Sequence, residues 1–310
     1  EHVRRLKNRG SELRSNGDLD AAEKHFEWAL AINPKCTTCL KDWAEVLLTK
    51  KKFVEAEKHI RRVLDLLEER DSDALFMLGL LLSEQGKDDE SIEAYKKSVS
   101  LNAEDAELCY NLGIKLGAKG DVKGEMAMYA RATSIDPTMG GPWLNWGTSL
   151  AESGNMEDAE VMFLKAMQCG SEVKPKAMMN MALIYQSRAN SLAAGGDLSG
   201  AKAQMVKAAG VLDGAKPLLQ QMSSSDDARQ YAAQFDPLRL QCHRLTGQIM
   251  AGMGDMEACE KEFRRATENF PNSQGAWQMF GRILELQGKV EEAQKAKDKI
   301  TLLGQFGGAF

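Results

Sequence analysis

The sequence predicts an all-α protein in which one small helical unit is repeated along nearly the whole chain. A glycine or alanine recurs about every 34 positions, and most of these anchors are followed seven residues later by a second glycine. The anchors are Gly10, Ala44, Gly79, Gly113, Gly147, Ala182, Gly247 and Gly281. A fixed period of this length is typical of stacked supersecondary units rather than of a globule with a single active-site cleft.

Each unit is predicted to contain two helices joined by a tight turn. The anchor lies within the first helix, where glycine costs about 1 kcal/mol relative to alanine, so we expect a neighbouring helix to approach closely there. The second glycine supplies the left-handed residue that ends the first helix. On the second helix a small and a large residue follow four positions apart and therefore share a face. These pairs are Ala22 and Phe26, Ser91 and Tyr95, Ala159 and Phe163, Ala201 and Met205, and Cys259 and Phe263.

This pattern resembles the tetratricopeptide repeat, a helix–turn–helix unit with Leu-Gly in its first helix and Ala, Phe, Ala and Pro in its second. The fifth copy carries it in Trp143, Trp146, Gly147, Leu150, Gly154, Ala159, Phe163 and Ala166. The fourth has Leu112, Gly113, Leu116, Gly120, Tyr129, Ala132 and Pro137, and the eighth has Trp277, Phe280, Gly281, Leu284, Gly288 and Ala293. The resemblance implies eight repeats in a right-handed α–α superhelix of about 17 to 19 helices.

We expect one continuous solenoid with an interruption before the seventh repeat. Repeats one to six cover 1–213, a helical insert covers 214–236, repeats seven and eight cover 237–301, and a C-terminal tail covers 302–310. The sixth repeat is extended, because fourteen residues instead of seven separate its anchor Ala182 from Gly196. In the insert, residues 223–225 are predicted to form a loop and Asp226 to cap a short extra helix. The insert either projects from the repeats and recognises a partner, or it folds back on repeats six and seven and fills the break in the repeat period.

Three positions depart from the repeat pattern. Glu125 stands in the fourth copy where a small residue is expected, so the helix contact there must be adjusted. Lys51 replaces the turn glycine of the second copy. Lys297 occupies the aromatic position of the eighth copy, as expected of a terminal repeat whose outer face is exposed to solvent.

Composition and charge argue against two classes of partner. The net charge is −5, and residues 71–170 hold 8 Lys and Arg against 17 Asp and Glu. This balance argues against nucleic acid binding and is typical of a solvated outer helix face. No apolar run approaches the length of about 18 residues that a membrane span needs. The chain begins at Glu1 rather than methionine, as expected of a processed or trimmed product.

The sequence predicts no enzyme active site, no cofactor and no metal. Phosphate-binding loops and HExxH motifs are missing, and the four histidines lie scattered along the chain. Cys36 and Cys39 form a CxxC, but a structural zinc needs about four ligands, so we interpret them as two small residues where repeats join. Six scattered cysteines make no disulfide framework, which favours a reducing compartment such as the cytosol, the nucleus, or an organelle matrix or stroma.

The resemblance places a partner in a concave groove that the first helix of each repeat lines. The residues expected to face this groove are polar at both ends of the array and largely apolar in repeats three to six. The predicted partner-binding residues are Phe76, Met77, Leu80, Tyr110, Asn111, Ile114, Leu144, Asn145, Met179, Asn180 and Leu183. Exposed apolar surface of this kind usually marks a binding site, unless other segments cover it.

Three of these residues, Asn111, Asn145 and Asn180, occupy the same position in consecutive repeats. Their amides can pair with an extended peptide backbone whatever its side chains are. The arrangement resembles the asparagine ladder in the tetratricopeptide superhelix of the intracellular O-linked N-acetylglucosamine transferase, although asparagine is also common at this position in the family. A carboxylate clamp like that of heat-shock co-chaperones is rejected, because Asp42 and Asp73 would repel a carboxylate.

These patterns predict a non-enzymatic scaffold or adaptor that holds an extended peptide or a helix of a partner protein in its groove. Two alternatives stay open. One is an assembly factor or peripheral subunit of a photosynthetic or respiratory complex in an organelle. The other is the repeat region of a larger enzyme such as a glycosyltransferase. In each case the expected partner is a protein, and neither nucleic acid binding nor a membrane span is expected.

Overall fold

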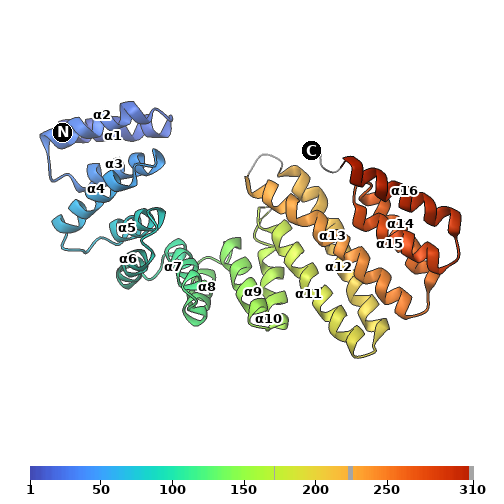
Figure 1. Cartoon of the computed structure of the whole chain (residues 1–310). Coiled ribbons are helices and arrows are strands. Elements are labelled where there is room, and N and C mark those ends of the chain that lie inside the picture. Colours follow the sequence, from blue (N-terminus) through green and yellow to red (C-terminus); the bar gives the residue numbers. More distant parts are fainter. Residues whose placement is uncertain (171, 223–225, 307–310) are drawn as a thin grey trace. The chain divides into compact units, whose positions relative to one another are not determined.

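Sixteen α-helices make up the part of the chain that the computed structural model describes, which is residues 1–170, 172–222 and 226–306 (Figure 1). That part contains no β-strand, and the predicted all-α fold is confirmed. The helices of the first half are α1 (His2–Ser15), α2 (Leu19–Ile32), α3 (Thr37–Thr49), α4 (Phe53–Leu66), α5 (Ser72–Glu84), α6 (Asp88–Leu101), α7 (Ala106–Ala118) and α8 (Val122–Ile135). They are followed by α9 (Gly140–Glu152), α10 (Met156–Ala166), α11 (Lys174–Ala194), α12 (Leu198–Gln221), α13 (Asp226–Gly252), α14 (Met256–Asn269), α15 (Gln274–Leu286) and α16 (Val290–Phe306).

The helices form two compact units, Glu1–Pro142 and Trp143–Phe310. In the first unit α1 packs on α2, α3 on α4, α5 on α6 and α7 on α8. In the second unit α11 packs on α12, α13 on α14 and α15 on α16. These antiparallel pairs, seen along the chain in Figure 1, are the two-helix units that the sequence period predicts.

Five anchor glycines lie directly against an aromatic ring of the second helix of the same repeat. A Cβ atom built at Gly79 would fall 2.5 Å from the Tyr95 ring, and one at Gly113 would fall 2.6 Å from the Tyr129 ring. Gly10, Gly147 and Gly247 stand in the same relation to Phe26, Phe163 and Phe263. The expected close approach is therefore confirmed, and burial of the ring offsets the poor helix propensity of glycine.

The eighth repeat lacks this ring. A Cβ atom at Gly281 would meet the methyl group of Ala296 at 3.3 Å. The side chain of Lys297 is 57% exposed, and its Nζ lies 2.6 Å from Oε1 of Glu285. Lys297 therefore lies at the surface, as expected of the last repeat.

The turn of the second repeat keeps its shape without glycine. The turn glycines Gly17 and Gly154 have φ of 83° and 84°, and Lys51 takes the same left-handed conformation with φ of 57°. A residue with a β-carbon pays about 1–2 kcal/mol in this region. The strain at Lys51 is thus local and small against the packing of the two helices that it joins.

A glutamate that follows the small residue of the second helix ties neighbouring repeats together. Glu23, Glu57, Glu160 and Glu260 share this position and pair with Lys50, Lys87, Arg188 and Lys289 of the next repeat. For Glu260, the hydrogen bond from Lys289 lowers the pKa of the carboxyl and outweighs the opposing effect of burial. In each of these ion pairs the carboxylate side chain is no more than 24% exposed, so screening by salt is weaker than at an open surface.

The sixth repeat is extended, since α11 has 21 residues and α12 has 24, whereas most other helices have 13 or 14. Residues 214–221 continue α12, and residues 226–236 begin α13, which runs without a break to Gly252. The insert therefore lengthens two existing helices, and the described residues contain fewer helices than the 17 to 19 expected. The predicted loop at 223–225 lies outside the described residues, as does the side chain of Asp226.

The apolar side chains of the insert are buried in the core of the second unit. Leu219 and Phe235 are 7% and 6% exposed, and they belong to the same hydrophobic cluster as Met205 and Leu212 of α12. Leu218 and Tyr231 pack against this cluster. These contacts favour a structural patch over a projection.

Candidate partner-binding surface

The structure divides the predicted partner-binding residues between the two units. Helices α5 and α7 of the first unit carry Phe76, Met77, Leu80, Tyr110, Asn111 and Ile114. Helices α9 and α11 carry Leu144, Asn145, Met179, Asn180 and Leu183, all in the second unit.

The six residues on α5 and α7, here named the α5/α7 surface, have related positions in successive repeats. The Phe76 ring lies 5.8 Å from the Tyr95 ring, and the Tyr110 ring lies 6.0 Å from the Tyr129 ring. The rings of Phe76 and Tyr110 on the first helices thus pack against the rings of Tyr95 and Tyr129 on the second helices. Those second-helix rings in turn contact the anchor glycines. All six side chains are half-buried except Ile114, which is 37% exposed. The result is an apolar surface held by the packing of the repeats and reachable from solvent.

A hollow of about 610 Å³ lies beside Tyr110 and Asn111. Its lining includes the carboxylates of Glu104, Asp105, Glu107 and Asp136, and no lysine or arginine of the described residues lines it. We name it the acidic hollow. Four negative charges next to an aromatic ring and an amide favour a positively charged group.

Two of these carboxylates are fixed by hydrogen bonds to the backbone. Oδ1 of Asp105 accepts the backbone N–H of Leu108 at 3.0 Å and so caps α7. Oδ1 of Asp136 accepts the hydroxyl of Thr138 at 2.6 Å and its N–H at 2.9 Å, and these bonds lower the pKa of Asp136. Asp136 is therefore ionised across the physiological pH range, and its orientation is set before any partner arrives.

In the second unit, two of the predicted residues are not at the surface. Leu144 and Met179 are each 4% exposed and belong to the hydrophobic core, whereas Leu183 is 48% exposed. For Met179 the reason is that α11 contacts α10, α12 and α13, so more of its surface is enclosed than in a regular repeat. Nδ2 of Asn180 donates a hydrogen bond of 3.3 Å to Oγ1 of Thr148 on α9, so this amide joins two neighbouring helices.

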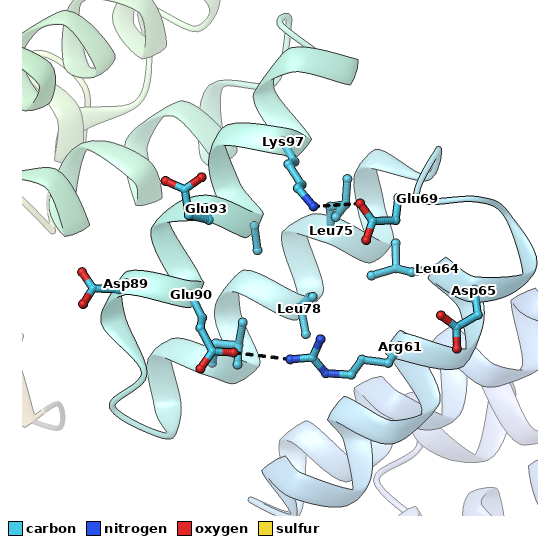
Figure 2. A pocket seen from close by; sticks show the side chains of 12 residues that line it. Arg61, Leu64, Asp65, Glu69, Leu75, Leu78, Asp89, Glu90, Glu93 and Lys97 are labelled. Carbon is cyan, nitrogen blue, oxygen red and sulfur yellow. Dashed lines mark hydrogen bonds and ion pairs between the residues drawn. The ribbon is translucent and has the colours of Figure 1, made fainter.

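A second hollow, of about 430 Å³, lies between α4, α5 and α6 (Figure 2). Its floor is apolar and its rim is charged. The floor is formed by Leu64, Leu75, Leu78, Leu82 and Ala94, and the rim by Arg61, Asp65, Glu69, Asp89, Glu90, Glu93 and Lys97. The pattern of the first helices does not reveal this site, because three of its rim carboxylates lie on the second helix of the third repeat. The signal for it in the sequence is the acidic run at 88–93.

Ion pairs already engage both cations of this rim. Figure 2 shows Lys97 paired with Glu69 at 2.8 Å and Arg61 paired with Glu90 at 3.6 Å, on either side of Leu78. A partner would have to displace these pairs to reach the floor. The acidic hollow has no such internal cations in its lining and is therefore the stronger candidate.

Among the described residues, no group of three or more His, Cys, Asp or Glu side chains is placed to hold a metal ion. In the same part of the chain, none of the helices has the length and apolarity required to cross a bilayer. Cys36 and Cys39 are joined in a disulfide, so the expectation of two independent small residues is wrong.

Paired helices, glycine–ring contacts and inter-repeat ion pairs define the chain as an α-helical repeat protein. Family models described as "Tetratricopeptide repeat" and "TPR repeat" match residues 7–69 and 79–120. The chain belongs to the tetratricopeptide repeat proteins, which are protein–protein interaction modules. The matching models are repeats alone and identify no enzyme domain. No curated protein sequence matches the chain.

Solved structures with TM-scores above 0.5 show the same fold at low sequence identity. The C-terminal part of a TPR repeat-containing protein from Cytophaga hutchinsonii is 13% identical, with 88% of this chain and 98% of that chain covered and a TM-score of 0.67. PilF of Pseudomonas aeruginosa is 15% identical, with 76% and 98% covered and a TM-score of 0.56. YrrB, described as a TPR protein with an unusual peptide-binding site, is 24% identical, with 54% and 86% covered and a TM-score of 0.47.

Proposed function

We propose that the chain is an adaptor that binds an extended, positively charged segment of a partner protein. The segment lies across the α5/α7 surface and places a lysine or arginine in the acidic hollow. The observation that carries the proposal is the row of four carboxylates beside Tyr110 and Asn111. An assembly factor, a complex subunit and the repeat region of a larger enzyme would each use such a surface.

The chemistry of the surface suits an extended peptide. Phe76, Leu80 and Ile114 offer apolar contact that a partner side chain would remove from water. The Asn111 amide both donates and accepts, so it can bond to a peptide backbone. The carboxylates of Glu107 and Asp136 supply charge-assisted hydrogen bonds to an ammonium or guanidinium group, which are stronger than neutral ones.

Binding of this kind has an electrostatic signature. Carboxylates that flank an open surface speed association with a basic segment, and this effect weakens as ionic strength rises. Affinity itself depends on a few central anchors, so we expect Tyr110 to contribute more than the surrounding residues. Tyr110 is in place before binding, because its ring packs on Tyr129.

The proposal is tested with an array of synthetic twelve-residue peptides that vary independently in charge and apolar content. The full chain should retain peptides that combine lysine or arginine with an apolar residue, and retention should fall with added salt. Glu107→Lys should reduce retention at least tenfold, whereas Glu152→Lys, the same charge change on an exposed residue of α9, should not. Retention without a basic preference, or equal behaviour of the two variants, would refute the proposed site.

A further inference from the structure

The bonded cysteines Cys36 and Cys39 lie where α3 begins. Cys36 is the N-cap residue of α3, and Cys39 lies in the first turn, with 5.3 Å between the two Cα atoms. That separation is in the ordinary range for a disulfide. Neither the repeat pattern nor partner binding at α5 and α7 requires this bond.

The two sulfurs differ in their access to solvent. Cys36 is half-buried, whereas Cys39 is 0% exposed and lies in the hydrophobic core with Leu40 and Ala44. An incoming thiol can therefore reach Cys36 without unfolding of the repeat, but it cannot reach Cys39. In an exchange reaction, the sulfur of Cys36 is therefore the one that an incoming thiol can attack.

The sulfur of Cys36 lies beside polar groups of the first turn of α3. Its Sγ accepts the backbone N–H of Cys39 at 3.3 Å and lies 3.5 Å from the hydroxyl oxygen of Thr38. The positive end of the helix dipole also stabilises negative charge on a group at this N-cap position. Cys36 therefore serves both as an attacking group and as a leaving group.

Three other buried cysteines of the described residues are not part of a disulfide. Burial raises the pKa of the thiols of Cys109, Cys242 and Cys259. These three are free thiols inside the helical core. They provide an internal comparison, because a general tendency to oxidise would affect them as well.

We propose that Cys36 and Cys39 form a thiol–disulfide exchange site that reacts with the dithiol of a protein or small molecule. A thiolate of the dithiol attacks Sγ of Cys36, the bond to Cys39 breaks, and Cys39 leaves as a thiolate that takes up a proton. The second thiol of the reductant then attacks the reductant sulfur that is bonded to Cys36, and Cys36 is released as a thiolate. Two electrons pass from the dithiol to the two cysteines, and the dithiol becomes a disulfide.

The tryptic peptide 36–41, which follows Lys35 and ends at Lys41, contains both cysteines and no other. The full chain is equilibrated with oxidised glutathione or with dithiothreitol, quenched in acid, unfolded, labelled with iodoacetamide and analysed by mass spectrometry. The peptide should carry no label after oxidised glutathione and two after dithiothreitol. Two labels under both conditions, or none under both, would overturn the proposal.

Two variants test whether an incoming thiol attacks Cys36 rather than Cys39. With oxidised glutathione, Cys39→Ala should accumulate a lasting glutathione adduct on Cys36, because the resolving thiol is gone. Cys36→Ser, which retains an N-cap side chain, should form at least tenfold less adduct on the buried Cys39. Circular dichroism checks that both variants are folded. Equal adduct formation in the two folded variants would contradict the assigned roles.

Discussion

Gly117 on α7 makes room for the carboxyl group of Glu125 on α8. A Cβ atom built at Gly117 would fall 2.8 Å from Cδ of Glu125, which is 8% exposed. The fourth repeat thus accommodates a large acidic side chain at a position where other repeats have a small residue, because the facing helix has lost its own side chain. The compensation lies within one helix pair and needs no change elsewhere.

The first prediction concerns this pair. Gly117→Ala should destabilise the chain although alanine favours helix, because the Glu125 side chain must leave its buried position. In the Glu125→Ala background the same change should be neutral or stabilising. Chemical denaturation of the four proteins should give a coupling energy on the order of 1–2 kcal/mol, as expected of residues in contact. Additive effects would contradict the direct contact.

The second prediction concerns the anchor glycines. Gly79→Ala should lower the free energy of unfolding by about 1–3 kcal/mol, the usual cost of overpacking a core. The Tyr95 ring that it would meet is 1% exposed and has nowhere to move. Gly210 in α12 is the control, because nothing lies within 4 Å of a Cβ atom there. Gly210→Ala should raise stability by up to about 1 kcal/mol through helix propensity alone.

The third prediction concerns the turn of the second repeat. Lys51→Gly should stabilise the chain by about 1 kcal/mol, since glycine adopts the left-handed conformation without the cost of a β-carbon. The reverse change in the third repeat, Gly86→Lys, should destabilise it by a similar amount. Gly86 has φ of 74°, and a Cβ atom there would touch nothing, so only backbone strain is measured. Thermal unfolding of both variants checks the opposite signs.

The fourth prediction concerns pH. The pKa of Glu260 is lowered by its bond to Lys289, so the folded state favours the ionised carboxyl. This contribution is fully present above the ordinary pKa of a glutamate and is lost as pH falls through the lowered value. Glu260→Gln should therefore be less stable than the native chain at pH 7, by about 1 kcal/mol. The difference should shrink at acid pH, as measured by urea denaturation; a constant difference would contradict the role of the charge.

The regular part of the fold was predictable because its signals are local. The glycine at 79 and the tyrosine at 95 lie within one repeat, so their spacing appears directly in the sequence. The burial of Met179 was not predictable in this way, because α11 also packs against α13, an element that begins more than 40 residues beyond Met179. The disulfide was missed for a related reason. The repeat pattern explains Cys36 and Cys39 as small residues, and only their geometry shows that the sulfurs are bonded.

For the α5/α7 surface, the repeat period predicts which face of each helix a partner can reach. It does not predict the negative charge of the acidic hollow beside that face. Phe76 and Tyr110 follow from their repeat positions, whereas the acidic hollow combines α7 with the segment that precedes α9. Asp136 belongs to that segment and would be taken for an ordinary turn residue in the sequence alone. The hollow exists because two consecutive repeats bring their connecting segments together.

The glycine–ring contacts join residues only 16 positions apart. Each repeat can close its own contact soon after its second helix leaves the ribosome, without waiting for distant parts of the chain. Folding that relies on such near neighbours is fast and exposes little apolar surface for long. The long helices α11 to α13 are different, because α11 must wait for α13 before its core is complete. Synthesis of the chain therefore passes from a stretch that can fold as it emerges to one whose core is complete only after about 60 further residues have been added.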